Sequence, residues 1–167
     1  MAKAKPKKKT AERVIGGPFL AAAFYCEGIL EDTHGKLTIQ NIIDSLHIVL
    51  SPFSPKDMPS DKAPLPFNIQ IMLAFKSGDA PGKHRLKLEI ESPSGRRDII
   101  KDEDITLTDP PYGGINIKNN IAMSIVSNGG LYLVDVYLDD VIMTRIPLNL
   151  TVTRAEMPAN VQMNNNA

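Results

Sequence analysis

The stretch from Gly129 to Thr153, GGLYLVDVYLDDVIMTRIPLNLTVT, alternates apolar and polar side chains with the period of a β-strand. Its apolar positions fall in two sets, before and after Asp139-Asp140: Tyr132, Val134, Val136 and Leu138, and then Ile142, Ile146, Leu148, Leu150 and Val152. The two aspartates between the sets are turn residues. The stretch therefore predicts an antiparallel hairpin with one apolar face, which favours an all-β sandwich.

Shorter strand patterns, separated by turn residues, recur along most of the chain. They lie at 19–27, 37–42, 67–76 and 84–91, with weaker ones at about 97–107 and 115–127. Residues 45–50 are expected to continue the second strand past a bulge. No sustained helical period appears. About eight or nine short strands predict an antiparallel β-sandwich with Greek-key connections, of the immunoglobulin-like or C2-like type.

Individual side chains are assigned to faces of these strands. Cys26 is expected to share an apolar face with Leu20, Ala22 and Phe24. Tyr132 is predicted to be a buried anchor of the closing hairpin. Because Pro147 has no N–H to donate to a ladder, its strand is expected to lie at an edge or to be bulged there.

Length and composition favour one domain with its own core. The expected divisions are a disordered basic tail at 1–15, the sandwich at 16–154 and a flexible polar tail at 155–167. Cys26 is the one cysteine, which suits a reducing compartment. No apolar run is long enough to span a bilayer, and no signal-peptide cleavage pattern follows the short apolar run at 19–26. We therefore expect a cytoplasmic protein.

The formal net charge of zero conceals an uneven distribution. Residues 1–13 hold six basic side chains and one acidic one, whereas the rest of the chain holds 13 basic and 18 acidic. A nonspecific anion-binding tail formed by Lys5, Lys7, Lys8 and Lys9 is one reading of the excess, and a solubilising leader is the other. Nucleic acid is a possible partner only through this tail.

A proline-rich segment, SPFSPKDMPSDKAPLP, spans residues 51–66 and holds five of the 13 prolines. Long loops in compact domains are often functional. The segment is either a stiff crossover between sheets or a partner-binding loop that would present Pro52, Phe53, Pro55, Pro59 and Pro64.

No motif of an enzyme or of a metal site emerges. Cys26 and His84 are a conceivable nucleophile and base, but both lie on predicted core faces and no orienting acid can be assigned. The three histidines lack zinc-ligand spacing. Two acidic pairs, at 31–32 and 139–140, and an acidic triplet at 102–104 are predicted in loops, where carboxylates either bind calcium or are ordinary turn residues. No catalytic residue, cofactor or metal is assigned.

Several segments together resemble a prokaryotic family of small β-sandwich proteins of unknown function. They are Phe24-Tyr25-Cys26-Glu27, His34 to Ile39, Gly82 to Leu88 with Pro93-x-Gly95, and Gly130-x-Tyr132 with Arg145 to Leu148. The resemblance covers roughly 18–153 and implies the fold without an activity.

The leading hypothesis is thus a non-enzymatic β-sandwich that binds protein or self-associates through an edge strand or the proline-rich loop. The alternative is a cation- or ligand-binding module that uses the acidic loops.

Overall fold

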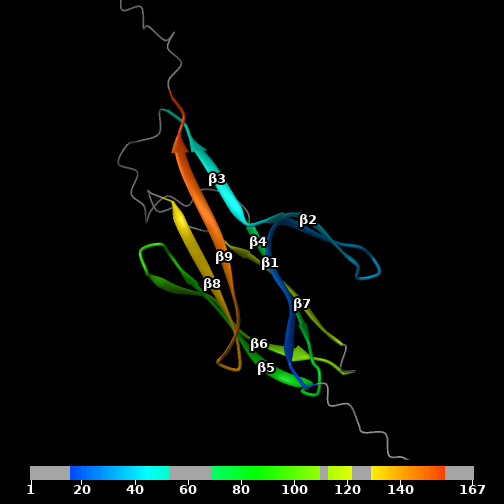
Figure 1. Cartoon of the computed structure of the whole chain (residues 1–167). Coiled ribbons are helices and arrows are strands. Elements are labelled where there is room, and N and C mark those ends of the chain that lie inside the picture. Colours follow the sequence, from blue (N-terminus) through cyan, green and yellow to red (C-terminus); the bar gives the residue numbers. More distant parts are fainter. Residues whose placement is uncertain (1–15, 53–68, 110–112, 122–128, 157–167) are drawn as a thin grey trace, which may run out of the picture.

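The computed structural model describes residues 16–52, 69–109, 113–121 and 129–156 of the 167. These residues form nine strands in two sheets (Figure 1). The first four strands are β1 (Phe19–Glu31), β2 (Leu37–Ile43), β3 (Ser45–Leu50) and β4 (Ile69–Lys76). The remaining five are β5 (Gly82–Glu91), β6 (Arg97–Leu107), β7 (Gly114–Ile121), β8 (Gly130–Leu138) and β9 (Val141–Arg154). The predicted all-β sandwich is confirmed.

The two sheets have the strand orders β2-β1-β4-β7 and β3-β9-β8-β5-β6. Both contain antiparallel hairpins of strands adjacent in sequence, such as β1–β2, β5–β6 and β8–β9. One pair of strands departs from the antiparallel arrangement, because β3 runs parallel to β9. Parallel neighbours cannot be joined by a tight hairpin turn, and here β4 to β8 lie between β3 and β9 in the chain.

The segment Leu37–Leu50 passes from one sheet to the other. β2 is the edge strand of the four-stranded sheet and β3 is the edge strand of the five-stranded sheet, with only Asp44 between them. The expectation that residues 45–50 continue the second strand past a bulge is therefore corrected: they change sheets. The backbone N–H of Asn149 donates to the Asp44 carbonyl at 3.2 Å and fixes the crossing. As a result, one side of the sandwich carries both of these edges.

The core fills the space between the sheets with branched apolar side chains. Most strands contribute alternate residues, as the period of two requires, whereas β2 contributes only Ile43 at its end. The fully buried ones include Ile71, Leu73, Phe75, Leu86, Leu88, Val134, Val136, Leu148 and Leu150. Tyr132 is buried as predicted. Tyr25 is also buried, and its hydroxyl donates to the Ile146 carbonyl at 3.0 Å, so one hydrogen bond joins β1 to β9 across the two sheets.

Two β-bulges change the predicted faces. In β1 the register shifts between Leu20 and Ala22, and Tyr25 packs in the core cluster. Cys26 therefore lies on the opposite face of β1 from Tyr25, beside Gln70 of β4, although its side chain is still buried. The expected face shared with Leu20 is corrected.

The second bulge lies between Val136 and Tyr137 of β8, opposite β9. It reverses the alternation along β9, so Ile142 and Ile146 no longer share a face: Ile142 is 51% exposed, whereas Ile146 is buried as expected. On the side of β9 that faces β3, Pro147 has no paired residue, because β3 pairs with β9 only from Asn149 onward. Its strand is internal to the sheet, but the position of Pro147 is a local edge, as its missing N–H requires.

Candidate functional site

The residues singled out for binding in the sequence lie almost entirely outside the described part of the chain. Pro52 is described, and it is half-buried in a turn just after β3. The other loop positions (Phe53, Pro55, Pro59 and Pro64) and the tail positions (Lys5, Lys7, Lys8 and Lys9) lie outside the described residues. Both hypotheses therefore stay predictions, as do the domain limits at 1–15 and 155–167.

The edge strands differ sharply in charge. β6 carries six charged side chains in its 11 residues: Arg97, Asp98, Lys101, Asp102, Glu103 and Asp104. β2, reading LTIQNII, carries none, and β3, reading SLHIVL, carries no Asp, Glu, Lys or Arg. Charged side chains along an edge discourage pairing with another chain. On one side of the sandwich, β6 is thus a highly charged edge and β7, the edge of the other sheet, carries one charge, Lys118. On the other side, the edge strands β2 and β3 lack such charges.

The uncharged side also exposes large apolar side chains. Ile42 of β2 is 61% exposed and Val49 of β3 is 59% exposed. Ile39 is exposed as well, and it lies on the opposite face of β2 from Ile42. An edge with free backbone groups and apolar side chains can accept a further strand, because main-chain bonds supply affinity and side chains supply specificity. This edge is the candidate interaction site.

A shallow pocket opens where this edge crosses between the sheets. Its volume is about 330 Å³, and residues of β1, β2 and β9 line it together with the crossover: Ala23, Phe24, Tyr25, Ile43, Asp44, Thr144, Arg145, Ile146 and Pro147. Asp44 places an exposed carboxylate at this pocket. The lining combines apolar groups with one acid and one guanidinium, so the pocket forms a recess beside the candidate edge.

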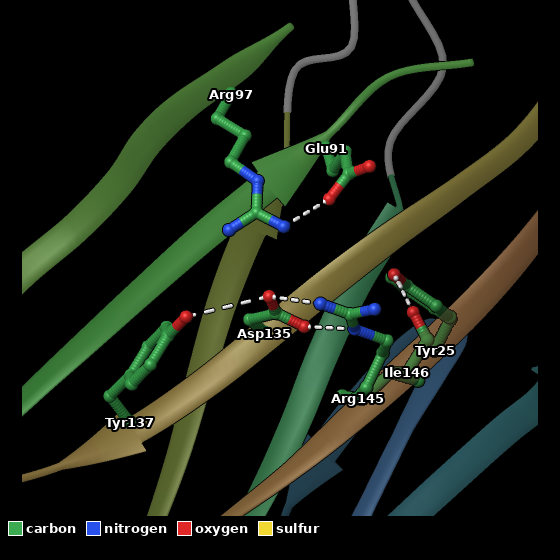
Figure 2. Close-up of polar contacts among 7 residues, drawn as sticks. All are labelled: Tyr25, Glu91, Arg97, Asp135, Tyr137, Arg145 and Ile146. Carbon is green, nitrogen blue, oxygen red and sulfur yellow. Dashed lines mark hydrogen bonds and ion pairs between the residues drawn. The ribbon is translucent and has the colours of Figure 1, made fainter. Parts of the chain in front are cut away.

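The outer face of the five-stranded sheet carries a network of paired charges (Figure 2). Arg145 of β9 donates two hydrogen bonds to Asp135 of β8, from Nε to Oδ1 at 2.5 Å and from Nη2 to Oδ2 at 2.8 Å. Arg97 pairs with Glu91 farther along the same face. The Asp135 side chain is only 3% exposed and the Arg145 side chain is 44% exposed. The acid is therefore buried beneath its partner, although both belong to the outer face of the sheet.

The pKa of Asp135 is lowered by this contact. The hydrogen bonds from Arg145 are the main cause, and they outweigh the burial, which by itself raises the pKa of the carboxyl. The same bonds raise the pKa of the Arg145 guanidinium. Lys87 lies 4.6 Å from the ring centroid of Tyr137 and also pairs with Glu89. The positive and negative side chains on this face are thus paired with one another, and we interpret the pairs as a structural network.

The structure does not bring Cys26 and His84 together. Cys26 lies in the four-stranded sheet, and its thiol is directed at the Gln70 carbonyl, with Sγ 3.8 Å from the oxygen. Burial raises the pKa of this thiol above its ordinary value, which disfavours the nucleophilic thiolate. His84 belongs to the other sheet.

His84 is instead held by Asp139, an orienting acid that sequence reasoning missed. The His84 Nδ1 lies 2.6 Å from Asp139 Oδ2, and Nε2 lies 3.0 Å from the Ala80 carbonyl. Burial lowers the pKa of His84, but the bonds to Asp139 and Ala80 outweigh it and the net pKa is raised. Asp139 also accepts the backbone N–H of Arg85 at 2.9 Å. The bonds fasten the start of β5 to the β8–β9 turn, so the pair is a structural clasp.

The acidic residues do not converge in the part described, and the prediction of a loop at 102–104 is wrong, because these three residues lie within β6. Asp102 binds Arg85 through both carboxylate oxygens, Asp139 binds His84, and Asp32 accepts the backbone N–H groups of its own turn. Among the described residues, no group of three or more histidine, cysteine or acidic side chains is placed to hold a metal ion. No helix in the described ranges is long and apolar enough to cross a membrane. Nothing here favours the calcium alternative.

Comparison with known proteins gives a family without an assigned activity. The sequence model of a family of unknown function, DUF6941, matches residues 21–151. No curated protein matches the chain.

Two similar solved structures come from Pseudomonas. One is an alkylpurine DNA glycosylase of Pseudomonas fluorescens bound to DNA containing an abasic site analog, with 11% identity, a TM-score of 0.45 and coverage of 65% of this chain and 28% of that one. The other is an immunoglobulin-like protein of Pseudomonas aeruginosa, with 12% identity, a TM-score of 0.36 and coverage of 83% and 99%.

Proposed function

We propose, for a chain that belongs to the DUF6941 family of unknown function, that it is a non-enzymatic interaction module which binds a protein strand at the edge formed by β2. The observation that carries this proposal is the contrast between the uncharged β2 and the highly charged β6. We place the module in the cytoplasm, in keeping with its single buried cysteine.

The exposure of β2 supports a role for the edge beyond the core. Residues 38 to 42 of this strand are all exposed, so the hydrophobic core does not account for their lack of charge. An exposed, uncharged edge is an aggregation hazard for a protein that leaves it open. A strand supplied by a partner removes the hazard, since it satisfies the free N–H and C=O groups and covers Ile39 and Ile42.

The polar groups of the described part support the non-enzymatic half of the proposal. The residues best suited to chemistry are committed to structural bonds: His84 to Asp139, Asp135 to Arg145 and the Cys26 thiol to a carbonyl. Their pKa shifts follow from these bonds and from burial. Titratable groups whose pKa values are shifted by bonds to other residues of the same fold are typical of structural networks rather than of a catalytic set.

Two isoleucines provide a matched test. Ile42 on β2 is 61% exposed and Ile99 on the opposite edge strand β6 is 60% exposed. Ile42→Lys places a charge on the candidate edge, and Ile99→Lys makes the same change on the already charged edge. Tagged full-length chains would be used to capture bound proteins from the native host, with circular dichroism as a check of folding.

We expect the wild type and I99K to retain the same bound proteins, including any second copy of the chain, and I42K to lose them. If folded I42K retains everything that the wild type binds, the edge is not the binding site and the proposal is wrong. Loss in I99K and retention in I42K would move the site to the other side of the sandwich.

A further inference from the structure

Two opposite charges bracket the uncharged edge strand. Lys36 precedes β2 and Asp44 follows it, with seven uncharged residues between them. Both side chains are exposed, and neither charged group makes an ion pair with another described residue. The positions themselves are fixed. The Lys36 carbonyl accepts from the Asp32 N–H, the Lys36 N–H donates to the Asp32 carboxylate, and the Asp44 carbonyl accepts from Asn149.

From this arrangement we propose that β2 pairs antiparallel with β2 of a second copy of the chain, around a twofold axis at Gln40. The inference rests on the proposed function, and it names the partner. In this register Lys36 of each copy lies opposite Asp44 of the other. The pairing also sets Thr38 against Ile42, which covers the most exposed apolar side chain of the strand.

The charges select this arrangement over its rivals. Parallel pairing of two copies in register would set Lys36 against Lys36 and Asp44 against Asp44, and like charges directly opposite each other are destabilising. A slip of one residue in the antiparallel register would take both charges out of opposition and would turn the apolar side chains to the wrong faces. Antiparallel pairing centred on Gln40 satisfies both charges twice, once at each end of the interface.

A twofold interface also suits the rest of the strand. An isologous contact uses the same patch on both copies, so every residue of the edge must tolerate its counterpart. At the axis Gln40 faces Gln40, and two side-chain amides can exchange hydrogen bonds. Ile39 faces Asn41 on one side of the axis and again on the other. The strand offers no position at which two equal charges meet.

Charge reversal tests the pairing directly. Lys36→Asp places two acids opposite each other at both ends of the dimer, and Asp44→Lys places two bases there. The full-length variants K36D and D44K would be compared with the wild type by sedimentation velocity over a range of concentrations and at two salt concentrations. An equimolar mixture of K36D and D44K, in which every pair is again opposite in sign, is the decisive sample.

We expect the wild type to dimerise and each single variant to dimerise roughly 10- to 30-fold more weakly, as two attractive pairs become repulsive. The mixture should recover dimers of wild-type strength, which misfolded variants could not do. High salt should narrow the differences, because the pairs are exposed.

A wild type that remains monomeric at millimolar concentration overturns the proposal, as do single variants that dimerise as well as the wild type. A mixture that fails to recover overturns the register. The edge-strand function fails separately: if the wild type is monomeric but captures another protein that I42K loses, the edge binds a partner other than a second copy.

Discussion

The buried pair formed by Asp135 and Arg145 predicts an unequal response to removal of its two halves. Arg145→Ala leaves an acid whose side chain is 3% exposed without its main partner, whereas Asp135→Ala leaves a guanidinium that is already 44% exposed. A stranded buried charge is far more costly than a stranded exposed one. R145A should therefore destabilise the protein more than D135A does, although both variants lose the two bonds between Arg145 and Asp135 and D135A also loses the one from the Tyr137 hydroxyl.

The sizes follow from the surroundings of each group. Breaking a buried pair costs about 3–5 kcal/mol in general, and the lower end applies to R145A because Arg97 and Tyr137 still favour the charged acid. For D135A we expect about 1–2 kcal/mol, because water replaces the lost bonds of Arg145. The double variant should cost less than the sum of the two, because once one partner is absent the other has no bond left to lose.

Urea unfolding at pH 7, followed by circular dichroism, measures all three free energies of unfolding. A second series at acidic pH tests the cause. Because the pKa of Asp135 is lowered in the folded state, its contribution is present above the unfolded pKa of about 3.9 and is lost as the pH falls through the folded value. The gap between wild type and R145A should therefore narrow in acid. Equal destabilisation by R145A and D135A, or a gap independent of pH, would refute this reasoning.

Three further outcomes are expected. The pKa of His84, followed by proton NMR, should lie above its ordinary value in the wild type and should fall in the variant Asp139→Asn. Because the pKa is raised in the folded state, the contact between His84 and Asp139 stabilises the folded protein fully below the unfolded pKa of about 6.5, and this stabilisation is lost as the pH rises through the folded pKa. Cys26 should react with a thiol reagent slowly in the native protein and rapidly in urea, and equal rates would contradict its burial. Tyr25→Phe should cost about 1–2 kcal/mol in urea unfolding, because it leaves the Ile146 carbonyl without its inter-sheet donor, and a change below about 0.3 kcal/mol would contradict that role.

The strands and the class of fold could be predicted because alternation reports directly which side chains share a face. The neighbours of a strand could not be read in the same way. Residues 45–50 alternate equally well as a continuation of β2 and as a strand of the other sheet, and the single polar residue at Asp44 gives no sign of the crossing. Tertiary packing decides the sheet to which an uncharged edge segment belongs.

The Asp135 network shows how one bulge can hide a pair from sequence reasoning. A regular hairpin closed by Asp139 and Asp140 would set Asp135 opposite Thr144. The bulge between Val136 and Tyr137 adds one residue to the β9 side, which brings Arg145 opposite Asp135 and Ile146 opposite Val134. The sequence did offer one signal of a buried pair, because Asp135 interrupts the apolar run YLVDVYL. The partner of Asp135 could not be read from the sequence, because it depends on the register between β8 and β9.

The clasp formed by His84 was missed for a related reason. Asp139 follows the end of β8, and β5 pairs with β8 so that Leu86 lies opposite Leu138. Once that pairing is known, the start of β5 must lie near the β8–β9 turn. The sequence places these residues more than fifty positions apart, and no local pattern joins them.

The same topology gives the segment Leu37–Leu50, which carries a single charge, its significance. Because β2 and β3 follow each other directly and each ends a sheet, a single stretch of 14 residues forms both edges on one side of the sandwich. Charges could stand at its exposed positions without harm to the core, as they do along β6. The one charge within it is Asp44, at the crossing, where it can face Lys36 of a second copy. An edge kept free of charge where it is exposed, and charged where a symmetric partner offers the opposite sign, is better suited to pairing than to solvent.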